Sequence, residues 1–295
     1  MLPLWSDQLQ IVLTPERATI TRLNSSVLGG SFKPREMPSN SMPCAAAEHG
    51  ESAWQPAIRA LQALLKQKNI SNSSASVLLS NHFVRYQLIS AQPDLSGLDE
   101  EQAFVRFSFA EVYGDEVKRW QLRWGAGLQL SPQVASAIDN ALIEQIETTL
   151  NNAAVKLNSL QPYLMAAFNY VRKWVDTSPH WFVLVEPGSA CAGFMQGGDW
   201  QQLHTSRLGA DWAADLPRVL GREFQMVGPI NERSQMIVCL PGYIDPKRIA
   251  PDNHVLRILT MTPEMLMQNA VQSITVQSAS KQSAKAQTAA TMGVK

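Results

Sequence analysis

Apolar and polar residues alternate along several short stretches of the chain, and a period of two is typical of β-strands. Residues 8–13 and 18–23 are two such stretches, and the turn at residues 14–17 between them predicts an opening hairpin. The turn signals at 187–189 and 197–199 predict a meander of strands later in the chain. The further predicted strands are residues 76–79, 83–89, 116–124, 154–160, 181–186, 190–196, 200–205, 235–240 and 255–260.

Apolar residues spaced by three or four positions predict helices between these strands. Ser52 and Gln55 form a capping box ahead of the first helical stripe. Residues 99–113 begin with acids and end at Gly114, which favours a helix, although part of this segment alternates like a strand. Residues 212–224 predict another helix, with Pro217 in its first turns. The first stripe consists of Trp54, Ile58, Leu61 and Leu65.

A long helix is predicted from Ser131-Pro132, because serine is a common N-cap and proline is favoured at the first helical position. Pro162 predicts the start of a shorter helix in the same way. Strand–helix order therefore recurs, which indicates a mixed α/β protein of two related halves. The apolar positions of the long helix are Val134, Ile138, Leu142, Ile146 and Leu150, and those of the shorter one are Leu164, Phe168, Val171 and Val175.

The order of elements also predicts where the halves lie along the chain. Residues 1–130 form the first lobe and include a long loop at 24–50 that is rich in Ser, Pro and Gly. Residues 131–272 form the second lobe. Residues 273–295 consist almost entirely of small, polar and cationic residues with little to bury, so we expect a disordered tail.

The segment Val183-Leu184-Val185-Glu186-Pro187-Gly188-Ser189, with its following glycine turn, resembles the second phosphate hairpin of the actin-like superfamily. Residues 77–86 and 103–114 are similar to the small inserted subdomain of bacterial assembly proteins of that superfamily, the PilM-like and GspL-like cytoplasmic components of type IV pilus and type II secretion machines. The resemblance implies a duplicated actin-like, ribonuclease H-like architecture of two lobes, with an inserted subdomain at about 75–124.

The phosphate hairpins depart from the pattern of nucleotide-binding relatives, which place Asp-x-Gly at each tip. The first tip, at residues 14–17, has no glycine, and Pro15 has no N–H to donate. The second tip has Glu186 in place of aspartate, beside Pro187. We therefore expect no cofactor. If Mg-ATP did bind, the resemblance would place it on Glu186, Gly188 and Ser189.

Composition and charge exclude several other classes of protein. The chain has 295 residues, 25 basic and 25 acidic, so no basic face is expected to hold a nucleic acid. Its three cysteines are far apart, which favours a reduced, cytoplasmic protein. The apolar runs are much shorter than the roughly 20 residues that span a bilayer, and the first residues do not resemble a secretory signal.

Other candidate sites have structural explanations. The five histidines never stand at a metal-ligand spacing, so no metal site is predicted. Acidic clusters at 99–101 and 115–116 lie at predicted helix boundaries, where they suit the helix dipole, and no catalytic residue is assigned. Trp200 and Trp212 flank the predicted meander. They are expected to pack in the core or, in the alternative interpretation, to line a groove that binds a protein partner.

The resemblance implies a non-catalytic, cytoplasmic scaffold of a bacterial envelope assembly. Its expected partner is a cytoplasmic segment of an inner-membrane assembly protein, which would recruit it to that membrane. Two alternatives stay open at this point. One is an ATPase or phosphotransferase of the same superfamily, in which Glu186 replaces the missing aspartate and Ser189 donates to a phosphate. The other is an unrelated α/β binding protein whose hairpin match is accidental.

Overall fold

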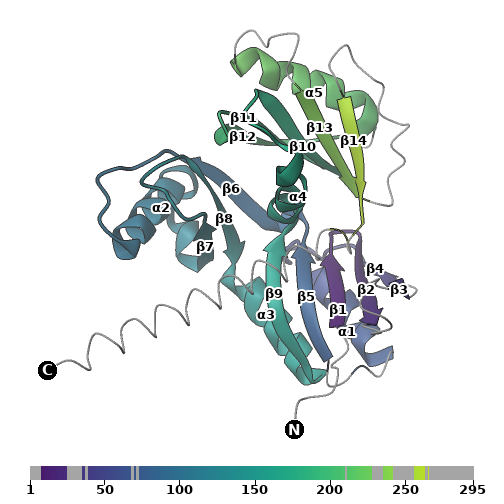
Figure 1. The fold of residues 1–295 in the computed structure, drawn as a ribbon. Helices are drawn as coiled ribbons and strands as arrows, with labels where there is room; N and C mark the ends of the chain where they lie inside the picture. Colours follow the sequence, from purple (N-terminus) through teal and green to yellow (C-terminus); the bar gives the residue numbers. More distant parts are fainter. Residues whose placement is uncertain are drawn as a thin grey trace, which may run out of the picture.

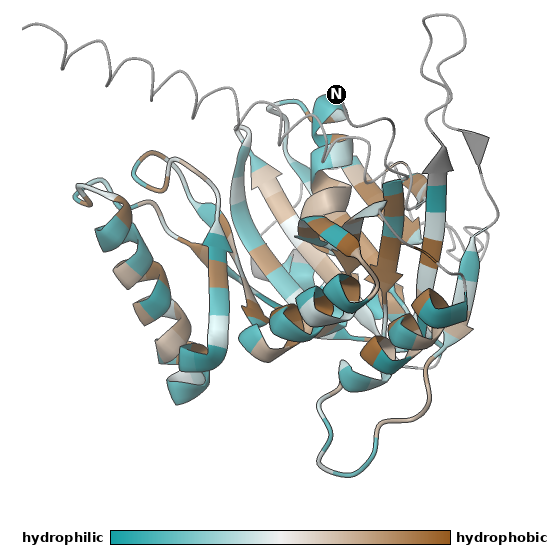
Figure 2. Ribbon diagram, turned by 90° about the horizontal axis from the view of Figure 1, so that it is seen from below, coloured by the Kyte–Doolittle hydropathy of each residue, from teal (hydrophilic) through white to brown (hydrophobic). Residues whose placement is uncertain are grey.

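The computed structural model describes residues 8–24, 35–36, 39–67, 70, 73–209, 211–227, 235–241, 256–262 and 265. Within them the chain forms two similar α/β lobes with a smaller subdomain beside them (Figure 1). Figure 2 shows brown, hydrophobic strands in the interior and helices that carry both brown and teal, as expected for helices that bury one face.

The first lobe contains a sheet in the order β3-β2-β1-β5-β9, with β4 also paired to β2. β1 and β2 are antiparallel, so the predicted opening hairpin is confirmed, whereas β5 and β9 continue the sheet as parallel strands. Helices α1 (Gln55–Gln67) and α3 (Asn140–Asn152) bury their apolar stripes against one face of this sheet. The strands are β1 (Gln8–Leu13), β2 (Arg17–Asn24), β3 (Arg35–Glu36), β4 (Asn40–Pro43), β5 (Ser73–Leu79) and β9 (Val155–Pro162).

The second lobe repeats this plan, with the sheet order β12-β11-β10-β13-β14. An antiparallel meander again leads into parallel strands, so the duplication predicted from the sequence is confirmed. Helix α5 (Trp212–Val227) covers one face, and α4 (Tyr163–Val171) packs on the other. The strands are β10 (His180–Glu186), β11 (Ser189–Gln196), β12 (Asp199–Arg207), β13 (Gln235–Pro241) and β14 (Leu256–Met261).

An inserted subdomain separates β5 from α3 and β9 (Figure 1). Its antiparallel sheet has the order β6-β8-β7, and the predicted helix at 99–113 is confirmed as α2. Phe109 and Leu128 lie at the centre of its own small core. The elements are β6 (Val84–Ile89), α2 (Leu98–Tyr113), the 3-10 helix η2 (Gly114–Arg119), β7 (Trp120–Trp124) and β8 (Gln133–Asp139).

The helix predicted from Ser131-Pro132 is wrong in its first part, because residues 133–139 form the strand β8. β8 is the central strand of the inserted sheet and is buried almost throughout, so it lacks the alternation by which a half-exposed strand is recognised. Val134 and Ile138 lie on this strand, and the helix α3 begins only at residue 140. Similarly, the predicted strand at 116–124 is confirmed only from residue 120, because η2 precedes it.

The predicted boundaries between the lobes also differ from the structure. β9 pairs with β5, so the first lobe extends to residue 162 and does not end at 130. The inserted subdomain covers 84–139 and not 75–124, because β5 belongs to the first sheet and β8 to the inserted one. The predicted loop at 24–50 contains β3 and β4, while 25–34 and the predicted tail at 273–295 lie outside the described residues.

Candidate functional site

The duplicated fold brings two hairpin turns to the same place between the lobes. The β1–β2 turn of the first lobe and the β10–β11 turn of the second line one cavity together with Ser80 and His82, which follow the carboxyl end of β5. Residues Asn81–Phe83 form the 3-10 helix η1. The cavity has a volume of about 50 Å³. Its lining residues are Thr14, Pro15, Glu16, Ser80, His82, Glu186 and Pro187.

Glu186, at the end of β10, connects the two lobes. Its side chain is only 2% exposed, and its Oε2 accepts a hydrogen bond of 2.9 Å from the backbone N–H of Asn81. Burial raises the pKa of the Glu186 carboxyl above its ordinary value, and the hydrogen bonds from Asn81 and Ser80, together with nearby His82, offset part of this rise. The carboxylate is therefore held by protein donors.

The next residues of the same turn also contact the first lobe. His82 Nε2 lies 2.8 Å from the carbonyl oxygen of Pro187 and is placed to donate a hydrogen bond to it. Gly188 has a φ of +79°, and a Cβ added there would lie 3.4 Å from His82 Cε1. Glycine is favoured at this position because it adopts the left-handed conformation without strain.

The Asn81 side chain extends the connection to two more elements. Its Oδ1 accepts a hydrogen bond of 2.6 Å from the Tyr86 hydroxyl on β6 and one of 3.0 Å from the backbone N–H of Leu164 in the first turn of α4. Burial raises the pKa of Tyr86 well above its ordinary value, and nearby Cys191 and Glu186 raise it further. Asn81 thus joins both lobes, the inserted subdomain and the helix between the lobes.

Several backbone N–H groups near the two turns already have hydrogen-bond partners within the protein. The backbone N–H groups of Thr14 and Ser80 donate to the carbonyl oxygens of Arg17 and Leu13, and that of Asn81 donates to Glu186. The cavity that these turns line is small, at about 50 Å³.

The structure brings only part of the sequence-predicted site together. Glu186 and Gly188 lie at the contact between the lobes, but Ser189 is paired in β11 and does not line the cavity. Sequence reasoning missed the part played by Asn81 and His82. The available signal was a polar triplet directly after the buried strand β5, since carboxyl ends of parallel strands are common sites of function.

The two predicted partner-binding tryptophans lie on opposite faces of the second sheet. Trp200 packs on the α4 side with its ring centroid 4.5 Å from that of Phe168. Trp212 is 5% exposed and packs under α5, with Trp181 and Leu216 in the same core cluster. Trp212 therefore serves the core on the other side of the sheet, as the first interpretation expects, and it does not line a groove together with Trp200.

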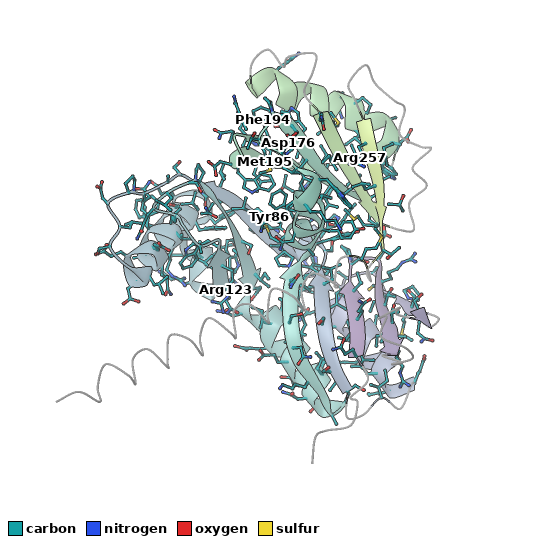
Figure 3. The ribbon with its side chains drawn as sticks, viewed as in Figure 1. Tyr86, Arg123, Asp176, Phe194, Met195 and Arg257 are labelled. Atoms are coloured by element: carbon teal, nitrogen blue, oxygen red, sulfur yellow. The ribbon has the colours of Figure 1, made fainter. Side chains whose placement is uncertain are left out.

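Trp200 does line a groove, which has a volume of about 530 Å³. One wall is the β7–β8 loop of the inserted subdomain, the floor includes Met165 and Phe168 of α4, and the other wall is the β11–β12 hairpin of the second lobe. Figure 3 labels Asp176 and Met195 close together on the second-lobe side, and both line this groove. Within the described ranges, no group of three or more potential metal ligands is found.

No protein-family model matches the sequence, and no curated protein matches it. Among solved structures, the chain is similar to the cytoplasmic domain of EpsL, an inner membrane component of the type II secretion system of Vibrio cholerae, with a TM-score of 0.58 and 11% identity over 90% of this chain and 95% of that one. It is also similar to a chain of the PilM-PilN type IV pilus biogenesis complex, with a TM-score of 0.59 and 13% identity over 90% and 94% of the two chains.

A third similar structure is a protein of unknown function from Bacteroides thetaiotaomicron that has an actin-like ATPase fold. Its TM-score is 0.53 at 8% identity, over 82% of this chain and 84% of that one. At these identities the likeness concerns the fold, and it agrees with the repeated sheet order of the two lobes. The chain described here therefore has the actin-like fold, in a form with an inserted subdomain.

Proposed function

We propose that this chain is a non-catalytic scaffold of a bacterial envelope assembly, which acts without a nucleotide at the cytoplasmic side of the inner membrane. The observation that carries the proposal is the hydrogen bond between Glu186 and the backbone N–H of Asn81. In a nucleotide-binding relative a carboxylate at this turn organises a magnesium-bound water. In this chain the carboxylate holds the lobes together directly.

The expected partner is a cytoplasmic segment of an inner-membrane assembly protein. Two similar folds support this proposal: EpsL is an inner membrane component of a secretion system, and PilM is part of a complex with PilN. No helix in the described ranges is long and apolar enough to cross a membrane. On this proposal, contact with the membrane comes through the partner.

A thermal-unfolding titration with Mg-ATP and Mg-ADP tests the absence of nucleotide binding. A ligand that binds only the folded state stabilises it by about 2.7 kcal/mol at 100 times its Kd. We expect no change in Tm with either nucleotide, in a sample whose cooperative unfolding shows that it is folded.

A rise in Tm that is lost in Gly188→Val would contradict the proposal and favour an ATPase or phosphotransferase. The matched control is Gly50→Val, which also replaces a glycine of positive φ but lies in an open turn away from the cavity. A rise that persists in Gly188→Val and disappears in Gly50→Val would place nucleotide binding elsewhere, and it too would contradict the proposal.

A further inference from the structure

We propose that the groove between the inserted subdomain and the second lobe binds a short protein segment in which an apolar anchor residue is flanked by lysine or arginine. This inference deepens the proposed function, because it assigns the place and the chemistry of the partner segment. The groove is separate from the cavity between the two hairpin turns, since no residue lines both.

The floor of the groove is suited to an apolar anchor. Met165 and Phe168 are half-buried and line the floor together with Trp200 and Met195, which are only 7% and 2% exposed, and the Phe168 and Trp200 rings are in contact. Aromatic rings provide a large rigid contact area, and methionines adapt to side chains of different shape, so both are common at sites that bind protein segments. The ring of Trp200 lies against Gly193, where an added Cβ would come within 2.9 Å of Cε3.

The rim of the groove is polar and carries more negative than positive charge. Asp176 and Asp199 are exposed on the second-lobe wall, and Arg172 is exposed at the end of α4. The Ser178 hydroxyl and backbone N–H donate to Asp176 and lower the pKa of its carboxyl, so this carboxylate stays ionised well below neutral pH. A cationic side chain beside the anchor would pair with these carboxylates at the rim.

This arrangement favours a protein segment over a small metabolite. A small-molecule site usually has a few polar groups that converge on the ligand inside a mostly enclosed pocket. In this groove the charged side chains are exposed at the rim, above an apolar floor, which is the anatomy of a protein–protein interface. The volume of about 530 Å³ has room for a few side chains of a segment laid across it.

The charge of the rim also agrees with the partner proposed above. Segments that flank the cytoplasmic ends of membrane-spanning helices carry an excess of lysine and arginine. A juxtamembrane segment with one apolar residue among such cations would match both the floor and the two carboxylates. An acidic segment would meet Asp176 and Asp199 as like charges.

Phage display tests this inference: random short peptides are selected for binding to the full chain. The affinity of synthetic copies of the enriched peptides is then measured by fluorescence anisotropy. We expect the enriched peptides to carry leucine, methionine or an aromatic residue beside lysine or arginine. Ala126→Arg, which places a cation on the inserted-subdomain wall, should weaken their binding by about tenfold. Leu130→Arg is the matched control, since Leu130 is 88% exposed in the same loop and does not line the groove.

Asn169→Arg, on the α4 wall, repeats the test should Ala126→Arg fail to fold. Replacement of both Asp176 and Asp199 by asparagine should weaken binding severalfold and reduce its salt dependence. Enrichment of acidic peptides, equal binding to Ala126→Arg, Asn169→Arg and Leu130→Arg, or no enrichment at all would overturn the inference. None of these results depends on nucleotide, so Mg-ATP binding in the thermal titration would contradict the proposed function separately.

Discussion

Glu186 and Asn81 are 105 residues apart in the chain, yet the carboxylate of one accepts a 2.9 Å hydrogen bond from the backbone N–H of the other. Both residues are at least 97% buried, so water does not compete for this bond. The contact joins the second hairpin of one lobe to the end of β5 in the other. The stability of the two-lobed fold therefore depends on this hydrogen bond.

The pH dependence of stability should change when Glu186 is replaced by glutamine. The folded-state pKa of Glu186 is raised above 4.5, so from pH 4.5 upward the folded state binds more protons than the unfolded state at this position. The contribution of the Glu186 carboxyl to the free energy of unfolding therefore falls as pH rises through its folded-state pKa. Glu186→Gln keeps an acceptor for Asn81, and its stability relative to wild type should increase between pH 4.5 and 8 in urea denaturation.

The matched control for that experiment is Glu144→Gln, on the exposed face of α3. The change in relative stability between pH 4.5 and 8 should be larger for Glu186→Gln than for this control. An equal change in the two variants would show that the buried carboxyl is not the source of the pH dependence.

Asn81→Ala should destabilise the fold by about 1–3 kcal/mol, because it leaves the Tyr86 hydroxyl and the Leu164 N–H without their shared acceptor. Tyr86→Phe removes only one donor and should cost less. Urea denaturation with Asn151→Ala, at an exposed position of α3, as a control measures both effects. A loss from Asn81→Ala no greater than that of the control would contradict the role assigned to this side chain.

Gly193→Ala should destabilise the second lobe, because the added Cβ would overlap the Trp200 ring and lie 2.9 Å from its Cε3. Overpacking of this kind typically costs about 1–3 kcal/mol. In a Trp200→Leu background the clash is absent, so the same change should be nearly neutral. Gly221→Ala, in an uncrowded part of α5, is the control and should be neutral or slightly stabilising. Equal losses in both backgrounds would disprove the proposed clash.

Alkylation should separate the three cysteines by rate. Cys44 is partly exposed, whereas Cys191 and Cys239 are buried. Burial, with a smaller contribution from nearby Glu186, raises the pKa of Cys191 to about 12, and burial also raises that of Cys239. In native protein at pH 8, iodoacetamide should modify Cys44 first, and the other two only after denaturation. Peptide mass spectrometry identifies the order, and early reaction at Cys191 would contradict the packing of the second lobe.

Much of the secondary structure follows from local patterns. The hairpin turns near Thr14 and Gly188 and the stripe of α1 were predicted because turn chemistry and side-chain period act over a few residues. Residues 133–139 were predicted wrongly because a strand buried on both faces has no alternation, and the preceding Ser131-Pro132 is a strong local helix signal. Only the partner strands β6 and β7 decide the conformation of this segment.

In the candidate site, too, some features follow from local sequence and others from tertiary packing. The absence of the usual Asp-x-Gly from the two hairpin turns could be predicted from the sequence, since it depends only on which residues occupy them. Tertiary packing brings Asn81 and His82 to the second turn, lets β9 close the first sheet, and places Trp200, but not Trp212, in the lining of a groove. These contacts join residues that are far apart in the chain. They depend on how the two lobes pack against each other and on which face of the sheet each helix covers, and a local hydrophobic pattern cannot predict either.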